Sequence, residues 1–197
     1  MTRALPLLIA AALIAALEVP ATAAEIAGIP VPTSARPVPD GPVLPLNGVG
    51  VRHKYFLRIY VAALYLPRPA DSLNGVLSQP GPKRIWMHFL YYRVSRSQLV
   101  GGWLEGFRAN LGSTEFQALS ARITAFNAMF ETLHRGDAVL LDYVPGIGTR
   151  VTVRGRERGV IPGADFYRAL LRIWLGDHPA DGGLKRALLA GHPPGPQ

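Results

Sequence analysis

Residues 48–67 read GVGVRHKYFLRIYVAALYLP, a segment that becomes almost entirely apolar or aromatic after its first few positions. Fully extended at about 3.3 Å per residue, the chain from Arg52 to Leu66 would reach about 50 Å, far beyond the usual strand of roughly 3–10 residues. The segment is therefore predicted to bend or break between Lys54 and Arg58. Arg52 then places a permanent positive charge at the mouth of a segment that otherwise belongs in a protein interior.

The face on which Arg52 lies decides which side chains can join it. On an unbroken strand Arg52 and Tyr60 share a face and Tyr65 lies opposite, whereas a one-residue bulge would bring Tyr65 to the face of Arg52. A buried guanidinium keeps its proton and costs several kcal/mol unless an anion or several acceptors lie beside it. One source of acceptors is an oxygen of a bound molecule. The other is a carboxylate of the chain itself, with three candidates: Glu105, Asp137 and Asp142.

The N-terminal residues 1–24 are predicted to be a secretory signal peptide. Arg3 gives a positive start, an apolar stretch follows from Leu5 to Leu17, and small residues form the exit at 21–24. The apolar stretch is shorter than the roughly 20 residues needed to cross a bilayer. We therefore expect an exported protein, periplasmic or secreted, with no membrane span.

The composition narrows the classes of function. The chain has no cysteine, which excludes disulfides, thiolate metal sites and covalent haem attachment. Its histidines never lie three or four residues apart, so no helical pair of metal ligands exists, and we expect no metal and no other cofactor. Basic residues outnumber acidic ones by 21 to 13. They are scattered along an exported chain, however, so we expect no nucleic-acid partner.

The chain is predicted to form one domain over residues 46–190. Residues 25–45 precede it as an extended arm, because six prolines between 26 and 45 exclude a helix or a central strand. The tail, residues 191–197, is rich in proline and glycine and is expected to be loose.

The first half of the domain begins with strands and continues with helices. Residues 83–92, KRIWMHFLYY, are bulky at successive positions, as in a strand covered on both faces. Ser95 and Gln98 form a capping box at the start of a predicted helix over 95–112. A second helix is expected from Ser113 until Arg135–Gly136, because apolar residues recur there at steps of three and four.

The second half reverses this order. Residues 137–163 alternate and contain glycine-rich turns, which predicts three antiparallel strands. Residues 164–176 return to helical spacing, and a short helix over 184–191 follows Asp181, a candidate cap. The predicted elements therefore follow one another as strands, helices, strands and helices. This order predicts an α+β domain with an antiparallel sheet that carries helices on one face.

Residues 47–66, NGVGVRHKYFLRIYVAALYL, are similar to the signature of the chalcone isomerase-like family, and three later segments extend the similarity. These are GDAVLLDYVPGIGTRVTVRG, GADFYRALLRIWLGDHPAD and LKRALL. The resemblance implies an open-faced β-sandwich, a large antiparallel sheet against a layer of helices, with a cleft between them. Plant isomerases of the family close a chalcone to a flavanone, and plastid members without that activity bind fatty acids. In both branches an arginine resembling Arg52 contacts an oxygen of the ligand.

The chain departs from the isomerases at the residues that handle protons. Their tyrosine falls near Leu99 and their asparagine near Gly106, and neither replacement can donate a side-chain hydrogen bond. The isomerases' threonine falls near Tyr60, which keeps a hydroxyl but fills more space. General acid–base help, worth about 10²–10⁴ in rate, would then be absent.

The sequence therefore predicts an exported binding protein for a small amphipathic molecule, a fatty acid or a similar carboxylate or carbonyl compound. Arg52 would hold its headgroup, and Tyr60 or Tyr65 would donate a second hydrogen bond. The predicted slot for the tail is lined from the sheet by Phe56, Trp86 and Phe89, and from the first long helix by Leu99, Trp103 and Phe107. Ordinary core packing is the alternative for each of these six.

Two other classes of function remain open. One is an isomerase or intramolecular lyase that acts on an α,β-unsaturated carbonyl with an altered set of donors. The other is a structural or accessory protein in which Arg52 is paired internally.

Overall fold

The computed structural model describes residues 24–191. The predicted signal peptide, apart from Ala24, and residues 192–197 of the tail lie outside the described residues. No helix in the described part is long and apolar enough to span a bilayer.

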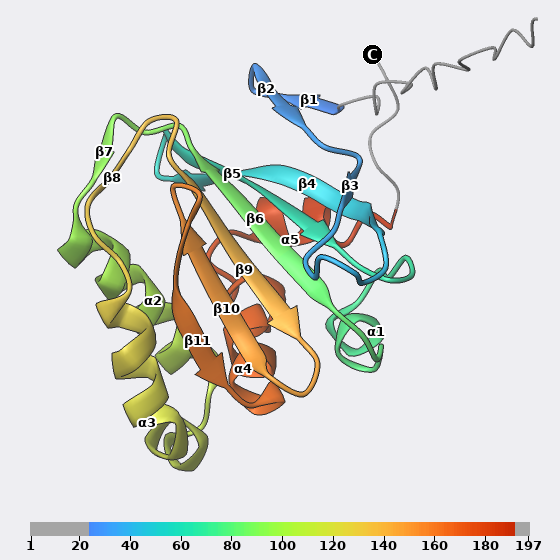
Figure 1. Cartoon of the computed structure of the whole chain (residues 1–197). Coiled ribbons are helices and arrows are strands. Elements are labelled where there is room, and N and C mark those ends of the chain that lie inside the picture. The colour runs from blue at the N-terminus through green and yellow to red at the C-terminus, as the bar shows by residue number, and fades with distance from the viewer. Residues whose placement is uncertain (1–23, 192–197) are drawn as a thin grey trace, which may run out of the picture.

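The centre of the structure is a sheet of seven strands in the order β11-β10-β9-β6-β5-β4-β3, with every neighbouring pair antiparallel (Figure 1). Its strands are β3 (Ser34–Ala35), β4 (Leu44–Lys54), β5 (Leu57–Tyr65), β6 (Lys83–Phe89), β9 (Ala138–Val144), β10 (Gly148–Val153) and β11 (Arg156–Pro162). Two small ribbons accompany it: β1 (Ala24–Ile26) with β2 (Ile29–Val31), and β7 (Arg93–Val94) with β8 (Leu133–His134).

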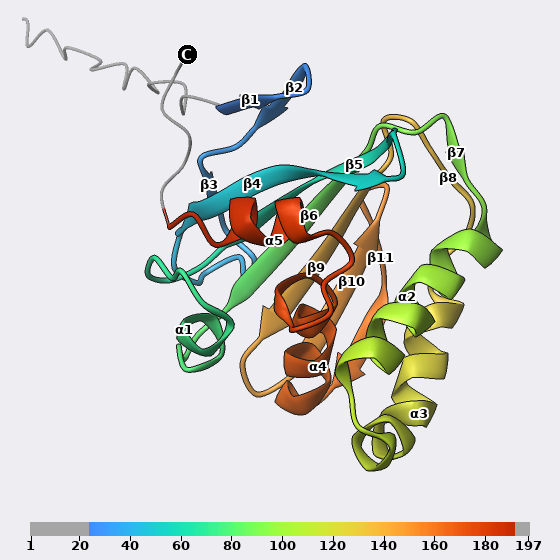
Figure 2. The same ribbon diagram turned by 180° about the vertical axis from the view of Figure 1, so that it is seen from behind.

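The helices gather on one face of this sheet (Figure 2). They are α1 (Leu73–Leu77), α2 (Arg96–Asn110), α3 (Ser113–Ala128), α4 (Ala164–Leu175) and α5 (Gly182–Leu188). In both views α4 lies against the sheet, α5 covers β4, and α2 and α3 extend the helical layer beside β11. The α+β fold predicted from the sequence, one open antiparallel sheet with helices packed on it, is confirmed.

The long apolar segment breaks where its length requires. β4 ends at Lys54 and β5 begins at Leu57, so Tyr55 and Phe56 form the turn, and Tyr55 takes a positive φ of 56°. The register places Arg52 directly opposite Tyr60. The segment is therefore a hairpin with Arg52 near its turn.

β5 is buried on both faces, because two cores lie on either side of it. The larger core, between sheet and helices, takes Tyr60, Ala62 and Leu64. The smaller one, on the outer face, takes Val61 and Tyr65 and is closed by the proline-rich arm. The arm also adds β3 to the sheet beside β4, so it packs as part of the domain.

Two expectations about the elements need correction. β6 is central, as expected, but its outer face is only half-buried at Trp86 and His88. The second long helix ends at Ala128, well before Arg135–Gly136. The apolar spacing continued past the helix because Phe130 and Leu133 still enter the core from an irregular link and from β8.

Gly48 and Gly50 let α5 approach β4 closely. A Cβ atom built on Gly48 would lie 2.2 Å from the carbonyl oxygen of Ala187, and one on Gly50 would lie 2.6 Å from the Cβ of Ala187. Asp181 caps α5 by accepting a hydrogen bond from the backbone N–H of Leu184 at 3.0 Å. The space left by the two glycines is therefore taken by another part of the backbone.

Candidate functional site

Arg52 lies at the end of β4 with its guanidinium carbon 5.5 Å from the centre of the Tyr60 ring. Its Nε is buried and has no hydrogen-bond partner within the described part of the chain. No carboxylate of residues 24–191 comes within 4.0 Å of the guanidinium. The charge is thus partly withdrawn from water without an ion-pair partner within that distance. Asp181 lies near, because its carboxylate accepts a hydrogen bond from the backbone N–H of His53, the residue after Arg52, at 2.7 Å, and after burial its charge helps to raise the pKa of Tyr60.

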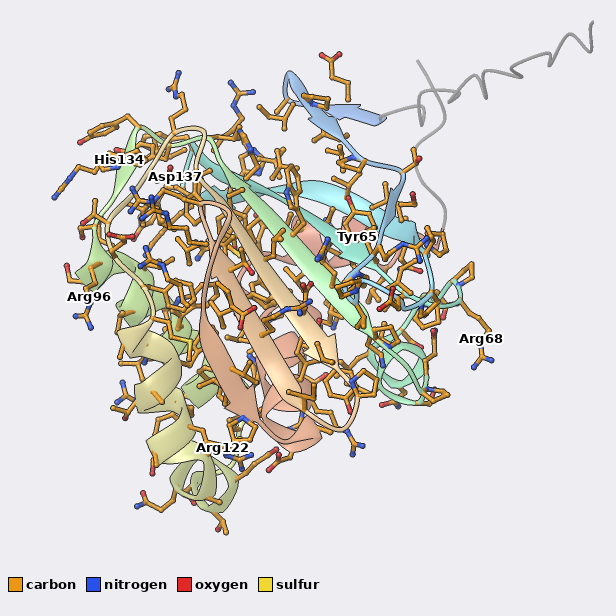
Figure 3. All side chains as sticks on the ribbon, viewed as in Figure 1. Tyr65, Arg68, Arg96, Arg122, His134 and Asp137 are labelled. Carbon is orange, nitrogen blue, oxygen red and sulfur yellow. The ribbon has the colours of Figure 1, made fainter. Side chains whose placement is uncertain are left out.

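The three acids considered as internal partners of Arg52 lie elsewhere. Asp142 is buried and accepts two hydrogen bonds from Arg84, at 2.6 and 2.7 Å. Asp137 accepts from the backbone N–H of His134 at 2.8 Å, and the two residues lie together at one end of the sheet (Figure 3). Glu105 is exposed on α2. None of these carboxylates neutralises Arg52.

Beside Arg52 lies a cavity of about 40 Å³, which we call the Arg52 cavity. It is bordered by the β4–β5 hairpin, the end of β6, β7, the first half of α2 and one side of α4. Its lining residues are Arg52, Ile59, Tyr60, Phe89, Val94, Gln98, Leu99, Gly102, Trp103, Ile173 and Ala180. Sites for whole drug-sized ligands run from about 300 to 1,000 Å³, so this cavity has room for a headgroup and few further atoms.

The hydroxyl of Tyr60 is placed to act as a donor. It accepts a hydrogen bond from the indole Nε1 of Trp174 at 2.9 Å, so its own proton remains available. Burial raises the pKa of Tyr60, and the nearby charge of Arg52 lowers it in part. The side chain therefore stays protonated at neutral pH.

A third donor comes from α2. The indole Nε1 of Trp103 is buried and has no hydrogen-bond partner among the described residues, and this side chain also lines the cavity. Trp103 packs edge-on against Trp174 at 5.6 Å between ring centres, which ties it to the indole that contacts Tyr60. The Arg52 cavity thus joins a guanidinium, a phenol and an indole, a set complementary to a ligand oxygen.

The structure brings five of the nine residues proposed for the ligand together. Arg52, Tyr60, Phe89, Leu99 and Trp103 all line the Arg52 cavity. Their role in binding stays a prediction, but their convergence on one cavity follows from strand pairing: Tyr60 lies opposite both Arg52 and Phe89.

The other four proposed residues lie away from this cavity. Phe56 occupies the hairpin turn and is 92% exposed. Tyr65 and Trp86 belong to the outer face of the sheet, and the Tyr65 hydroxyl donates to the carbonyl of Pro32 at 2.9 Å (Figure 3). No bulge interrupts β5 between Tyr60 and Tyr65, so the two rings point to opposite faces. Phe107 is fully buried deeper between the helices, against Phe126 and Phe166.

Two further residues, Ile173 on α4 and Gln98 on α2, line the cavity but were not predicted to contact a ligand, and neither was Trp174, which donates a hydrogen bond to the Tyr60 hydroxyl. Trp174 and Ile173 carried a signal as members of the apolar face of α4, but only tertiary packing shows that this face closes the cavity. Gln98 was assigned to the capping box, which it does form by accepting from the backbone N–H of Ser95 at 2.9 Å. The same side chain also borders the cavity.

The sequence model described as chalcone isomerase-like matches residues 23–190. This chain belongs to the chalcone isomerase-like family. Among solved structures, the crystal structure of a fatty-acid binding protein from Arabidopsis thaliana is similar, with a TM-score of 0.60 and 16% sequence identity. The alignment covers 82% of this chain and 92% of that one, and at this identity the likeness shows the shared fold. None of the curated proteins matches the chain.

Within the chalcone isomerase-like fold, the position of Gly106 has no room for a side chain. A Cβ atom there would lie 2.8 Å from Cγ2 of Ile173 on α4. An asparagine at this place would need α2 and α4 to separate. Leu99, where the isomerases were expected to carry a tyrosine, lines the Arg52 cavity with an apolar side chain.

Proposed function

We propose that this member of the chalcone isomerase-like family is an exported binding protein for a small amphipathic molecule with a carboxylate or carbonyl headgroup, such as a fatty acid. The observation that carries the proposal is the buried Nε of Arg52, which has no partner within the described residues and belongs to a side chain that lines the Arg52 cavity. Leaving such a donor unsatisfied costs about 1–3 kcal/mol, and more for a charged group. A ligand oxygen in the cavity would remove this cost.

The arrangement of donors supports an oxygen-bearing headgroup. Arg52, the Tyr60 hydroxyl and the Trp103 indole can all donate, and each has a hydrogen that no described acceptor takes. A carboxylate offers lone pairs to several donors at once, and a carbonyl offers two. Bonds to the guanidinium would be charge-assisted in the case of a carboxylate, which favours the acid over the ketone.

The size of the cavity places a condition on the tail. About 40 Å³ accommodates a headgroup, so a long tail must leave the cavity, for example beside the exposed Gln98 and the half-buried Gly102, or displace apolar side chains such as Leu99. The fold similarity to a plant protein named as a fatty-acid binding protein favours an acyl tail. The affinity should then rise with the length of the acyl chain only if the apolar side chains around the Arg52 cavity move apart to admit the tail.

Ligand extraction tests the proposal. The protein is purified from cells without detergent and extracted with organic solvent, and the extract is examined by mass spectrometry. Affinities for acids of increasing chain length are then measured by titration calorimetry. Arg52→Ala should weaken binding about 10- to 100-fold, the worth of a charge-assisted hydrogen bond. Arg58→Ala, an exposed change of equal charge on the same hairpin, should bind normally.

The outcomes separate the three functional classes. Equal binding by wild type and Arg52→Ala, or no binding of any acid by folded protein, would contradict the proposal and leave the structural or accessory role. If Arg52→Ala fails to fold, Arg52→Met keeps the side-chain volume and takes its place. Conversion of 2′-hydroxychalcone faster than buffer would support the isomerase alternative. We expect none, because Gly106 and Leu99 supply no donor.

Export forms part of the proposal and has its own test. The full chain, expressed in a Gram-negative host, should appear in the periplasmic fraction, with its N-terminus at about residue 24 or 25. An uncleaved protein confined to the cytoplasm would contradict this part and leave the binding proposal intact.

A further inference from the structure

A second hollow lies at the opposite end of β6 from the Arg52 cavity. Phe89, at one end of β6, borders the Arg52 cavity, and Lys83, at the other end, borders this hollow, about 20 Å away along the strand. Its volume is about 380 Å³, enough for a whole small molecule. Its polar side chains include Gln79, Lys83, Tyr143, Tyr167 and Arg168, and Gly81 contributes backbone. We call it the Lys83 hollow.

Lys83 is the unusual residue in this wall. It is only 4% exposed and points to the helix side of β6, in a row continued by the apolar Ile85 and Met87. Its ammonium donates to the carbonyl of Gln79 at 2.7 Å and to that of Gly81 at 3.3 Å. One of its three N–H groups therefore remains available.

The buried charge of Lys83 has no acidic ion-pair partner among the described residues. Residues 24–191 place no carboxylate within 4.0 Å of the Lys83 ammonium, and the residues that line the hollow include no aspartate or glutamate. Asp165, in the first turn of α4, is held by two hydrogen bonds from Arg122, at 2.7 and 2.6 Å. Its charge is thus committed to another cation.

Further positive charge reaches the hollow from α4. Arg168 lines it, forms no ion pair among the described residues, and lies close enough to lower the pKa of Lys83 further. Burial is the larger cause, and together the two effects bring the pKa of Lys83 to about 8. Ala164, the first residue of α4, also lines the hollow, so the positive end of the helix dipole lies there.

The remaining wall is apolar or aromatic. The ring of Tyr143 lies 5.3 Å from the Lys83 ammonium and stacks on Tyr167 with 5.3 Å between ring centres. Leu77 and Leu171 complete this side. A ligand that matches the hollow therefore needs an anionic end and an apolar body.

We propose that the Lys83 hollow is a second binding site, for an organic oxyanion with an apolar body. The oxyanion contacts the free N–H of Lys83 and the guanidinium of Arg168, and the body packs on Tyr143, Tyr167 and Leu171. This site is independent of the Arg52 cavity and shares no lining residue with it. Carboxylates and phosphate esters share the required chemistry.

Titration calorimetry with octanoate, octyl phosphate, octanol and inorganic phosphate tests the site on the Arg52→Ala protein, in which the first cavity is weakened. The two amphipathic anions should bind, and octanol should bind at least about tenfold more weakly. A clear preference between octanoate and octyl phosphate identifies the natural headgroup. Octanol binding as tightly as the anions would overturn the proposal.

Variants of the two cations assign the binding to this hollow. Arg168→Gln should weaken the anions about fivefold, and Lys83→Met more than about tenfold. Arg156→Gln removes an exposed charge at the β10–β11 turn and should leave binding unchanged. If Lys83→Met does not fold, Arg168→Gln carries the test, because its side chain is exposed. Binding by Arg168→Gln, or by folded Lys83→Met, equal to that of Arg156→Gln would overturn the proposal, and Lys83 would then only anchor the Gln79–Gly81 loop.

Discussion

Replacing Lys83 by methionine should change how the stability of the fold depends on pH. The pKa of Lys83 is about 8 in the folded protein and about 10.5 in an unfolded chain. Between these values the unfolded state binds more protons than the folded state, so the wild type gains stability as pH rises. The methionine variant lacks the group and gains nothing from this source.

The size of the effect follows from the width of that window. A pKa difference of one unit corresponds to about 1.4 kcal/mol. From about pH 7.5 to about pH 9.5 the wild type should therefore gain about 2 kcal/mol in its free energy of unfolding relative to Lys83→Met. The gain should level off above about pH 10.5. Tyr143, Tyr167 and Arg168, the other titratable groups that face Lys83, are shared by both proteins.

Urea denaturation followed by tryptophan fluorescence measures this difference at each pH. The slope carries the test, since methionine also removes the hydrogen bonds to the carbonyls of Gln79 and Gly81 and so shifts the value at every pH. Lys54→Met, an exposed lysine near the hairpin turn, controls for the change in net charge. A stability difference that stays flat or falls between pH 7.5 and 9.5 would refute the reasoning that burial has moved the proton equilibrium of Lys83.

Two further predictions concern the packing around the sites. Gly106→Ala should lower the free energy of unfolding by about 1–3 kcal/mol, because its Cβ would lie 2.8 Å from Ile173. Gly101→Ala, on the same helix, adds a Cβ that would meet nothing within 4 Å, so it should raise the free energy of unfolding by up to about 1 kcal/mol. Equal effects of the two variants in urea denaturation would argue against tight contact of α2 with α4. Asp142→Ala should cost about 3 kcal/mol, because it removes a buried acid from the half-buried guanidinium groups of Arg84 and Arg150. Asp165→Ala breaks an exposed ion pair and should cost about 1 kcal/mol or less, so similar melting temperatures for the two variants would contradict this ranking.

The sequence determined much of the fold through local physics. The length of the apolar segment required a break near Lys54, and Ser95 with Gln98 marked the start of α2 as a capping box. The end of α3 could not be predicted in this way. Phe130 and Leu133 continue the helical spacing by coincidence, since they reach the same core from an irregular link and a strand.

The candidate site was predictable where strand pairing alone decides it. Arg52 and Tyr60 share a face at a spacing of eight residues, and the hairpin preserves that relation as a direct cross-strand pair. Tyr65 lies on the outer face because β5 pairs with β6 without a bulge between Tyr60 and Tyr65, and no residue in β5 signals that regularity. Trp86 lies on the same outer face. Trp174 enters the site through the angle at which α4 crosses the sheet, which is a tertiary property.

The close contact of α5 with β4 has a consequence for ligand selectivity. α5 rests on Gly48 and Gly50, and Asp181 at its start also accepts a hydrogen bond from the backbone N–H of His53 at 2.7 Å, next to Arg52. The C-terminal segment therefore holds the backbone of β4 on both sides of Arg52. Sequence changes in α5, remote from any bound molecule, could retune which headgroups are accepted while the lining side chains stay the same.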